Sequence, residues 1–247
     1  MNACISFSGG LDSTCLLMYL LSKNYDVKCY SFKYGQKHER IELEKAQHNI
    51  SFLREKKFNI QHQIIDLTDV FNESASSLHA KNNQEIPKGS YTAATQKSTV
   101  IENRNIIFAA ILYGKALSWA KHTNSNVDIF LGIHAGDGSI YPDCSDESRL
   151  AAELCFRISN WDSEKVSYQA PFVKLSKGSV LEKGIAAMYD LGMDDNEIRQ
   201  ALTNTHSCYE PDRRGRSCGQ CGSCTERMAA FTDNKLEDPV DYIDCFI

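Results

Sequence analysis

A glycine pair between an apolar segment and a helical segment constrains this chain more than any other feature. Residues 3–7 are apolar, as in a buried strand, and residues 14–21 suit a helix. Ser8-Gly9-Gly10-Leu11-Asp12-Ser13 runs between them. Two glycines let the backbone turn tightly, so that several N–H groups point into one hollow. The following helix directs its positive end there as well. The stretch therefore predicts a binding site for phosphate or pyrophosphate.

Strand-like and helix-like segments alternate after this turn. Strands separated by helices imply right-handed crossovers and a parallel sheet with helices on both faces. Ligands of such sheets bind beyond the carboxyl ends of the strands, where the glycine pair lies. We therefore expect a doubly wound α/β fold. The further strands are expected at residues 27–32, 60–66 and 127–132, and long helices at residues 36–56 and 106–122.

The chain length of 247 residues suits one α/β domain with an appendage. We expect residues 1–203 to form that domain, with residues 204–247 as a C-terminal segment packed on its core. Residues 68–97 are polar and show no clear periodicity. A loop of this length is usually functional or disordered, so we expect a mobile lid near the active site.

Charge and hydropathy exclude several classes of partner. The formal net charge of −5 argues against non-specific binding to nucleic acid. Residues 213–216 are locally basic, and we favour a solvated loop there over a phosphate contact. No apolar run reaches the roughly 20 residues of a membrane span, and no basic-then-apolar leader is present. We expect a cytoplasmic protein with no membrane partner.

Cysteine is abundant, with ten residues in the chain. Five of them stand in apolar surroundings and are expected to act as small core side chains. These are Cys4, Cys15, Cys29, Cys155 and Cys245.

Four further cysteines form a cluster: Cys208, Cys218, Cys221 and Cys224. Two overlapping C-x-x-C units and one more thiolate supply the four ligands of a tetrahedral Zn²⁺. A site filled by four sulfur atoms is closed, so its role would be structural. A redox pair at Cys218 and Cys221 is the alternative.

The glycine stretch lacks the lysine-bearing form G-x-x-x-x-G-K-[ST]. Its pattern S-G-G-x-D-S resembles that of the PP-loop ATP pyrophosphatases, which have a HUP-like fold and cleave ATP between the α and β phosphates. Further motifs follow in order: residues 32–38, Asn103-Arg104-Asn105, and Tyr141-Pro142-Asp143-Cys144. Together with the cysteine cluster they resemble the 7-cyano-7-deazaguanine synthase (QueC) family, from about residue 3 to residue 231.

This resemblance implies an activity. Such enzymes use ATP and Mg²⁺ to convert 7-carboxy-7-deazaguanine and ammonia into 7-cyano-7-deazaguanine through adenylated intermediates. The family also suggests a homodimer.

The resemblance further implies site residues. The expected catalytic residues are Asp12, Arg104 and Lys177. The expected nucleotide-binding residues are Phe7, Ser8, Gly9, Gly10, Leu11, Asp12, Ser13 and Thr14. The expected substrate-binding residues are Tyr34, Gln36, His38, Arg104, Asn105, Asp137, Tyr141 and Asp143. His38 and His134 are candidates for proton transfer.

Three alternatives stay open at this point. A defence-associated relative would join a deazaguanine carboxylate to an amine of a protein or nucleotide. A PP-loop tRNA sulfur transferase would need a free catalytic cysteine, for which Cys144 is the candidate. A zinc-containing module that binds nucleic acid without catalysis is the third.

Overall fold

A single parallel sheet organises the chain. The computed structural model describes residues 1–89, 93–138 and 141–243. The strand order is β3-β2-β1-β4-β5, and each neighbouring pair is parallel. The strand order reverses at β1, which pairs with β2 on one side and with β4 on the other. The strands are β1 (Asn2–Ser6), β2 (Asp26–Lys33), β3 (Gln61–Asp66), β4 (Val127–Phe130) and β5 (Val166–Gln169).

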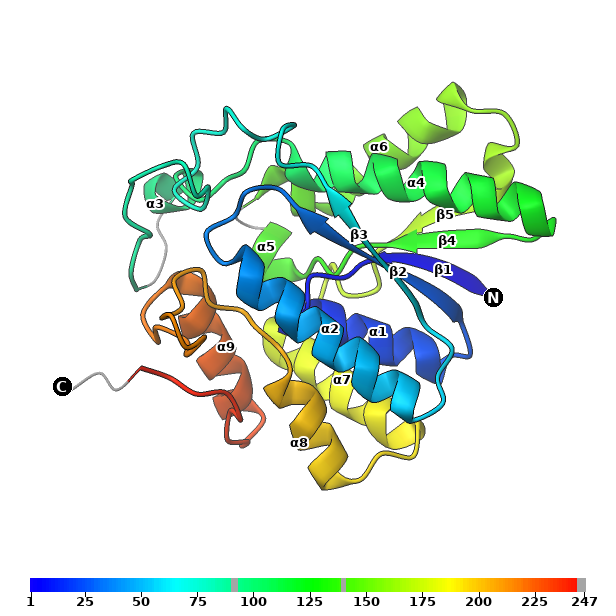
Figure 1. Cartoon of the computed structure of the whole chain (residues 1–247). Helices are drawn as coiled ribbons and strands as arrows, with labels where there is room; N and C mark the ends of the chain where they lie inside the picture. The colour runs from blue at the N-terminus through cyan, green and yellow to red at the C-terminus, as the bar shows by residue number, and fades with distance from the viewer. Residues whose placement is uncertain (90–92, 139–140, 244–247) are drawn as a thin grey trace.

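Helices cover both faces of the sheet (Figure 1). One face carries α1 (Leu11–Ser22), α2 (Glu39–Glu55), α7 (Lys177–Asp190) and α8 (Asp195–Thr203). The other face carries α4 (Arg104–Thr123) and α6 (Asp146–Ser159). Three helices gather beyond the carboxyl ends of the strands: α3 (Ala93–Lys97), α5 (Ala135–Gly138) and α9 (Gly222–Asp233). Short 3-10 turns occur at Pro142–Cys144 and Ser163–Lys165.

The hydrophobic core has two parts, one on each face of the sheet. Leu16 and Val180 represent the part between the sheet, α1 and α7. Phe108 and Ile129 represent the part between the sheet and α4. Burial of apolar side chains on both faces is what a parallel sheet requires. The predicted doubly wound α/β fold is confirmed.

The expected elements lie close to the observed ones, with one instructive difference. The helix expected from residue 36 begins at Glu39. Gln36 is instead held in a turn, because its side-chain amide accepts from the backbone N–H of Tyr34 and donates to the carbonyl of Phe32. Elements β5, α6, α8 and α9 were not among the predicted ones.

The predicted lid segment has internal packing. Its described part buries Phe71, Leu78 and Ile86, and His79 forms an isolated antiparallel bridge with Gln36. The backbone N–H of Ser77 donates to the carbonyl of Ser98 at 2.7 Å. These contacts fasten the segment beside the carboxyl end of β2. Its role as a lid stays a prediction.

Only some of the five cysteines expected in the core are buried. Cys4, Cys15 and Cys29 are buried. The prediction is wrong for Cys155, which is exposed, because it lies on the side of α6 that faces solvent. Cys245 lies outside the described residues.

The C-terminal segment lies against the α/β layers. Helix α9 packs beside α7, and Asn234 donates to the carbonyl of Gly178 at 3.0 Å. Arg227 of α9 is buried and pairs with Asp238 at 2.8 Å. The division of the chain into a domain of residues 1–203 and a C-terminal segment of residues 204–247 stays a prediction. Within the described ranges, every helix is too short or too polar to cross a membrane.

Gly184 tests the packing of α7 on α1. A Cβ atom at Gly184 would lie 2.3 Å from Sγ and 2.7 Å from Cβ of Cys15. Gly184→Ala should therefore lower the free energy of unfolding by about 1–3 kcal/mol in urea denaturation. Gly114→Ala is the matched control, since Gly114 is in α4 and a Cβ atom added there would meet open space. That change should raise stability by roughly 0.5–1 kcal/mol. Equal effects of the two substitutions would contradict the described packing.

Candidate active site

A cleft of about 480 Å³ opens where the carboxyl ends of β1, β2 and β4 meet. The glycine turn after β1 forms one wall, and the segments after β2 and β4 form two others. The first residue of α7 and the first turns of α9 close it. The cleft thus lies at the reversal point of strand order, where doubly wound sheets bind ligands.

Hydroxyl groups and backbone set the shape of the glycine turn. The N–H of Gly10 donates to Oγ of Ser8 at 3.1 Å, and Oγ of Ser13 donates to the carbonyl of Gly10 at 3.2 Å. Gly9 has a φ of +77°, and a Cβ there would lie 2.6 Å from the backbone nitrogen of Ala46. Glycine is therefore required at this position, because α2 approaches the turn so closely.

The predicted nucleotide-binding residues divide into two groups. Those that line the cleft are Ser8, Gly10, Asp12 and Ser13. The other four support the turn: Phe7, Leu11 and Thr14 are buried, and Gly9 lies against α2.

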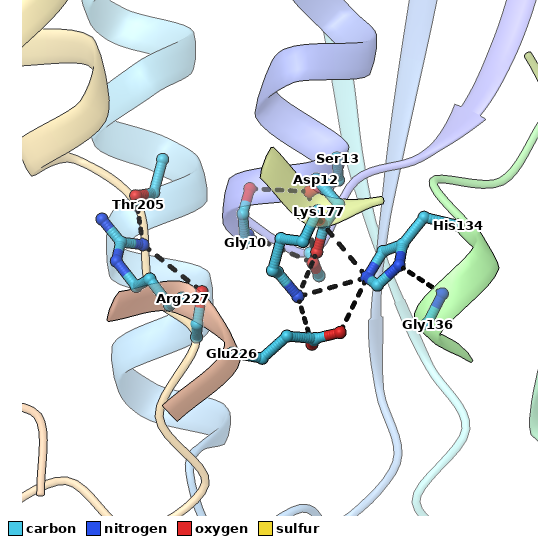
Figure 2. Close-up of polar contacts among 11 residues, drawn as sticks. Gly10, Asp12, Ser13, His134, Gly136, Lys177, Thr205, Glu226 and Arg227 are labelled. Carbon is cyan, nitrogen blue, oxygen red and sulfur yellow. Dashed lines mark hydrogen bonds and ion pairs between the residues drawn. The ribbon is translucent and has the colours of Figure 1, made fainter. Parts of the chain in front are cut away.

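Lys177 connects three parts of the chain (Figure 2). Its Nζ lies 3.1 Å from Oδ2 of Asp12 in α1 and 2.9 Å from Oε2 of Glu226 in α9. It also lies 3.3 Å from Nε2 of His134, in the segment after β4. Ser176 caps α7 by accepting from the N–H of Ser179, which places Lys177 at the first helical position.

Asp12 is held as a carboxylate in this cluster. Burial by itself raises its pKa, but Lys177 and His134 outweigh burial and hold the pKa below its ordinary value. Within the described chain, Oδ1 of Asp12 is buried without a hydrogen-bond partner. Nδ1 of His134 lies 3.1 Å from the backbone nitrogen of Gly136, while Nε2 faces the Lys177 ammonium. The cluster thus combines one ammonium with two carboxylates and an imidazole.

Some of the predicted substrate-binding residues line the cleft and others do not. Tyr34, His38, Arg104, Asn105 and Tyr141 line the cleft. The Arg104 guanidinium donates to the Tyr34 hydroxyl at 3.3 Å and to Oδ1 of Asn105 at 3.3 Å. Among the described residues, no carboxylate lies within ion-pair distance of Arg104. A partly buried cation without a counter-charge favours an anionic ligand.

The remaining predicted residues have supporting contacts. Gln36 is buried and fixes the turn after β2. Oδ2 of Asp143 accepts from the N–H of Asn105 at 3.3 Å, at the start of α4. Neither residue lines the cleft. Asp137 is in α5, but its side chain lies outside the described residues.

Several residues that line the cleft were not predicted from the sequence. Glu226 follows the last cysteine of the cluster by two positions, and only the fold brings it to Lys177. Glu42 stands in the first turn of α2, and His206 and Tyr209 flank Cys208. The position of Glu42 one turn after His38 was an available signal, because both residues then lie on the same helical side.

The cysteine cluster has the geometry of a metal centre. The Sγ atoms of Cys208, Cys218, Cys221 and Cys224 all lie within 4.8 Å of one another. Backbone N–H groups of Glu210 and Cys218 donate to Sγ of Cys208 at 3.3 and 3.2 Å. Such donors orient and stabilise thiolate ligands. This donor set fits one tetrahedral metal ion.

The fold and the cleft together define an α/β protein with a phosphate-binding type of glycine turn and an attached four-cysteine cluster suited to a metal ion. Comparison with known proteins assigns it further. The family described as "Queuosine biosynthesis protein QueC" matches residues 2–235. The chain belongs to this family, which confirms the resemblance predicted from the motifs.

Relatives with the name 7-cyano-7-deazaguanine synthase align with nearly the whole chain. One from Methanoregula boonei is 36% identical over 98% of this chain and 99% of its own length. One from Marinomonas sp. is 36% identical over 98% of both. A third, from Caldicellulosiruptor saccharolyticus, is 35% identical over 98% of this chain and 96% of its own length.

Cys221→Ser should remove the bound metal and destabilise the protein together, since loss of a thiolate ligand removes binding energy that also contributes to folding. Elemental analysis and thermal denaturation would measure both effects. Cys155→Ser is the control, because Cys155 is exposed and lies outside the cluster. Full metal content and an unchanged melting temperature in Cys221→Ser would refute the metal centre.

Proposed function

We propose that this protein converts 7-carboxy-7-deazaguanine and ammonia into 7-cyano-7-deazaguanine at the expense of two molecules of ATP. The family and the names of its relatives support this activity. The observation that carries it is the shared cleft. A phosphate-binding turn, the ammonium of Lys177 and the unpaired guanidinium of Arg104 all face the same space.

The chemistry depends on adenylation, which converts an oxygen that is a poor leaving group into part of AMP, a good leaving group. A carboxylate oxygen of the base attacks the α phosphorus of ATP, and pyrophosphate leaves. Ammonia then displaces AMP and forms the amide. The amide oxygen attacks a second ATP, again releasing pyrophosphate, and loss of AMP with the amide protons forms the nitrile.

The protein contributes mainly orientation and charge stabilisation. Backbone N–H groups near Gly10 and the Ser13 hydroxyl would hold the pyrophosphate. Lys177 would neutralise its developing charge, after exchanging part of its contact with Asp12 and Glu226 for phosphate oxygens. Arg104 would hold either the carboxylate of the base or the α phosphate, for which its planar fork is suited.

Two metal ions belong to this proposal. The closed set of four sulfur ligands suits a structural Zn²⁺, which would fix the start of α9. Mg²⁺ is usually held by one or two carboxylates together with substrate phosphates. The buried, unpartnered Oδ1 of Asp12 fits such a role, with Glu226 as the second carboxylate. Bound there, Mg²⁺ would neutralise phosphate charge.

Cysteines that bind metal must stay reduced, which supports our proposal of a cytoplasmic location.

The three alternatives are less well supported. Relatives that match along their whole length carry the name of the free-base synthase rather than of a sulfur transferase or a binding module. Cys144 lines the cleft, but it is buried and its Sγ accepts from the Asn105 amide at 3.1 Å. That contact indicates a packing role.

A second copy of the chain is the partner that we propose. Leu150, Leu154 and Ile158 recur every four residues along one side of α6 and are 52%, 59% and 77% exposed. Trp161, just after the helix, is 91% exposed. Glu147 and Arg157 flank opposite ends of this stripe, and neither forms an ion pair within the described chain. Antiparallel pairing of two copies would place each near its opposite charge.

Asp12→Asn should reduce AMP formation by at least about 100-fold without unfolding the protein, because it removes a charge from the phosphate site while keeping the side-chain volume. The assay follows AMP and the nitrile by mass spectrometry, with ATP, ammonium and 7-carboxy-7-deazaguanine. Asp162→Asn is the control, since Asp162 is exposed and far from the cleft. Absence of nitrile with the unmodified protein would refute the proposed function; full turnover in Asp12→Asn would refute its role.

Leu154→Glu should convert the dimer into a monomer, because it places a charge at the centre of the apolar stripe. Light scattering after size-exclusion chromatography measures the mass. Val70→Glu is the matched control, with the same 59% exposure outside the stripe. A monomeric unmodified protein, or a dimer that survives Leu154→Glu, would contradict this interface.

A further inference from the structure

The cleft contains a carboxylate that the phosphate chemistry does not use. Glu42 lies in the first turn of α2, and its side chain is 15% exposed. Its Oε2 accepts from the Gln36 amide at 2.8 Å, and its Oε1 lies 3.6 Å from Nε2 of His38. Within the described chain, Glu42 forms no ion pair with lysine or arginine. Burial raises its pKa to about 7, although the Gln36 amide and Arg104 favour the ionised form.

His38 does not supply the missing positive charge. Burial and the nearby Arg104 lower its pKa to about 3, so the imidazole is neutral near pH 7. Glu42 is therefore a nearly buried carboxylate with one neutral donor on one oxygen and one distant neutral neighbour on the other. Leaving such a group without further donors costs free energy, which a ligand with N–H groups would recover.

The turn after β2 fixes Glu42 relative to Arg104. Gln36 contacts Glu42 through its Nε2 and the backbone of Tyr34 through its Oε1. The hydroxyl of Tyr34 in turn accepts from Arg104. Tyr34 thus connects the two groups: its hydroxyl contacts Arg104, and its backbone N–H contacts the Gln36 side chain that donates to Glu42.

Aromatic side chains form the walls around these two charges. Tyr34, Phe108 and Tyr209 line the cleft, and the rings of His38 and Tyr209 lie 5.5 Å apart. Planar walls with one cation and one carboxylate complement a flat heteroaromatic ligand that carries an anionic group and a separate edge of N–H donors.

We propose that Glu42 determines base specificity by accepting hydrogen bonds from the N1–H and the exocyclic 2-amino group of the deazaguanine, while Arg104 faces its carboxylate. This inference rests on the proposed function, because it assigns the substrate of that same cleft. It gives Glu42 the recognition role that the sequence analysis assigned to Asp137 and Asp143.

Glu42→Gln tests the assignment with a predictable geometry. The Gln36 amide donates toward residue 42, so the new amide must present its oxygen to Gln36 and its NH₂ group toward the ligand. The NH₂ group of residue 42 would then face the N1–H and the 2-amino group of the base, and no hydrogen bond could form between these donors. We expect kcat/KM for 7-carboxy-7-deazaguanine to fall by about 10–100-fold, with the KM for ATP within about twofold of the unmodified protein.

The 2-deamino analogue of the base supplies the discriminating comparison. The unmodified protein should prefer the guanine-type base over this analogue by about 10–100-fold, and Glu42→Gln should bring the ratio close to one. Glu44→Gln is the matched control, since Glu44 is in the same helix, pairs with Arg40 on the surface and does not line the cleft. It should keep the preference of the unmodified protein.

Three results would overturn the assignment: equal use of both bases by the unmodified protein, a full preference retained in Glu42→Gln, or a rise in the KM for ATP alone. Calorimetric binding of the two bases to the unmodified, metal-loaded protein gives the same ratio without a variant, in case Glu42→Gln does not fold. That measurement also separates the two hypotheses. A protein that discriminates the bases only when Glu42 is present, but forms no nitrile, would refute the proposed function and leave the role of Glu42 supported.

Discussion

The contact of Lys177 with Asp12 and Glu226 is the interaction on which the organisation of the cleft depends. It joins the N-terminal parts of α1, α7 and α9 at one point. An ammonium between two carboxylates is well compensated in the absence of a ligand, and each carboxylate can release it in part when phosphate arrives. The same contact thus holds three helices together and places an ammonium beside the glycine turn.

The cysteine cluster also affects the position of Glu226, because Cys224 and Glu226 belong to the same part of α9. Glu226 lies two residues after Cys224 in α9, and the N-cap of α9 is Cys221. A metal held by the four thiolates would therefore set the start of the helix that delivers Glu226 to Lys177. Arg227, the next residue, anchors the same helix through Asp238 and Thr205. A metal bound by the cysteine cluster would therefore couple to the geometry of the cleft through the N-terminal part of α9.

The parts of this account that follow from the sequence are those that depend on local chemistry. The glycine pair, the spacing of the four cysteines and the alternation of apolar segments each act over short distances, so the sheet and the thiolate cluster were predictable. The residues missed or misassigned depend on long-range packing. Glu226 and Glu42 reach the cleft only because α9 and α2 fold against the glycine turn, and Asp143 is diverted to the start of α4. Cys155 was wrongly placed in the core because the apolar character of α6 belongs partly to its exposed side.

The most direct test of the central claim is isotope exchange between radiolabelled pyrophosphate and ATP in the absence of ammonia. The cleft described here should transfer adenylate reversibly to a carboxylate, so label should enter ATP only when 7-carboxy-7-deazaguanine is present. Label that never enters ATP, or that enters equally without the base, would contradict the assignment of this cleft to cleavage between the α and β phosphates.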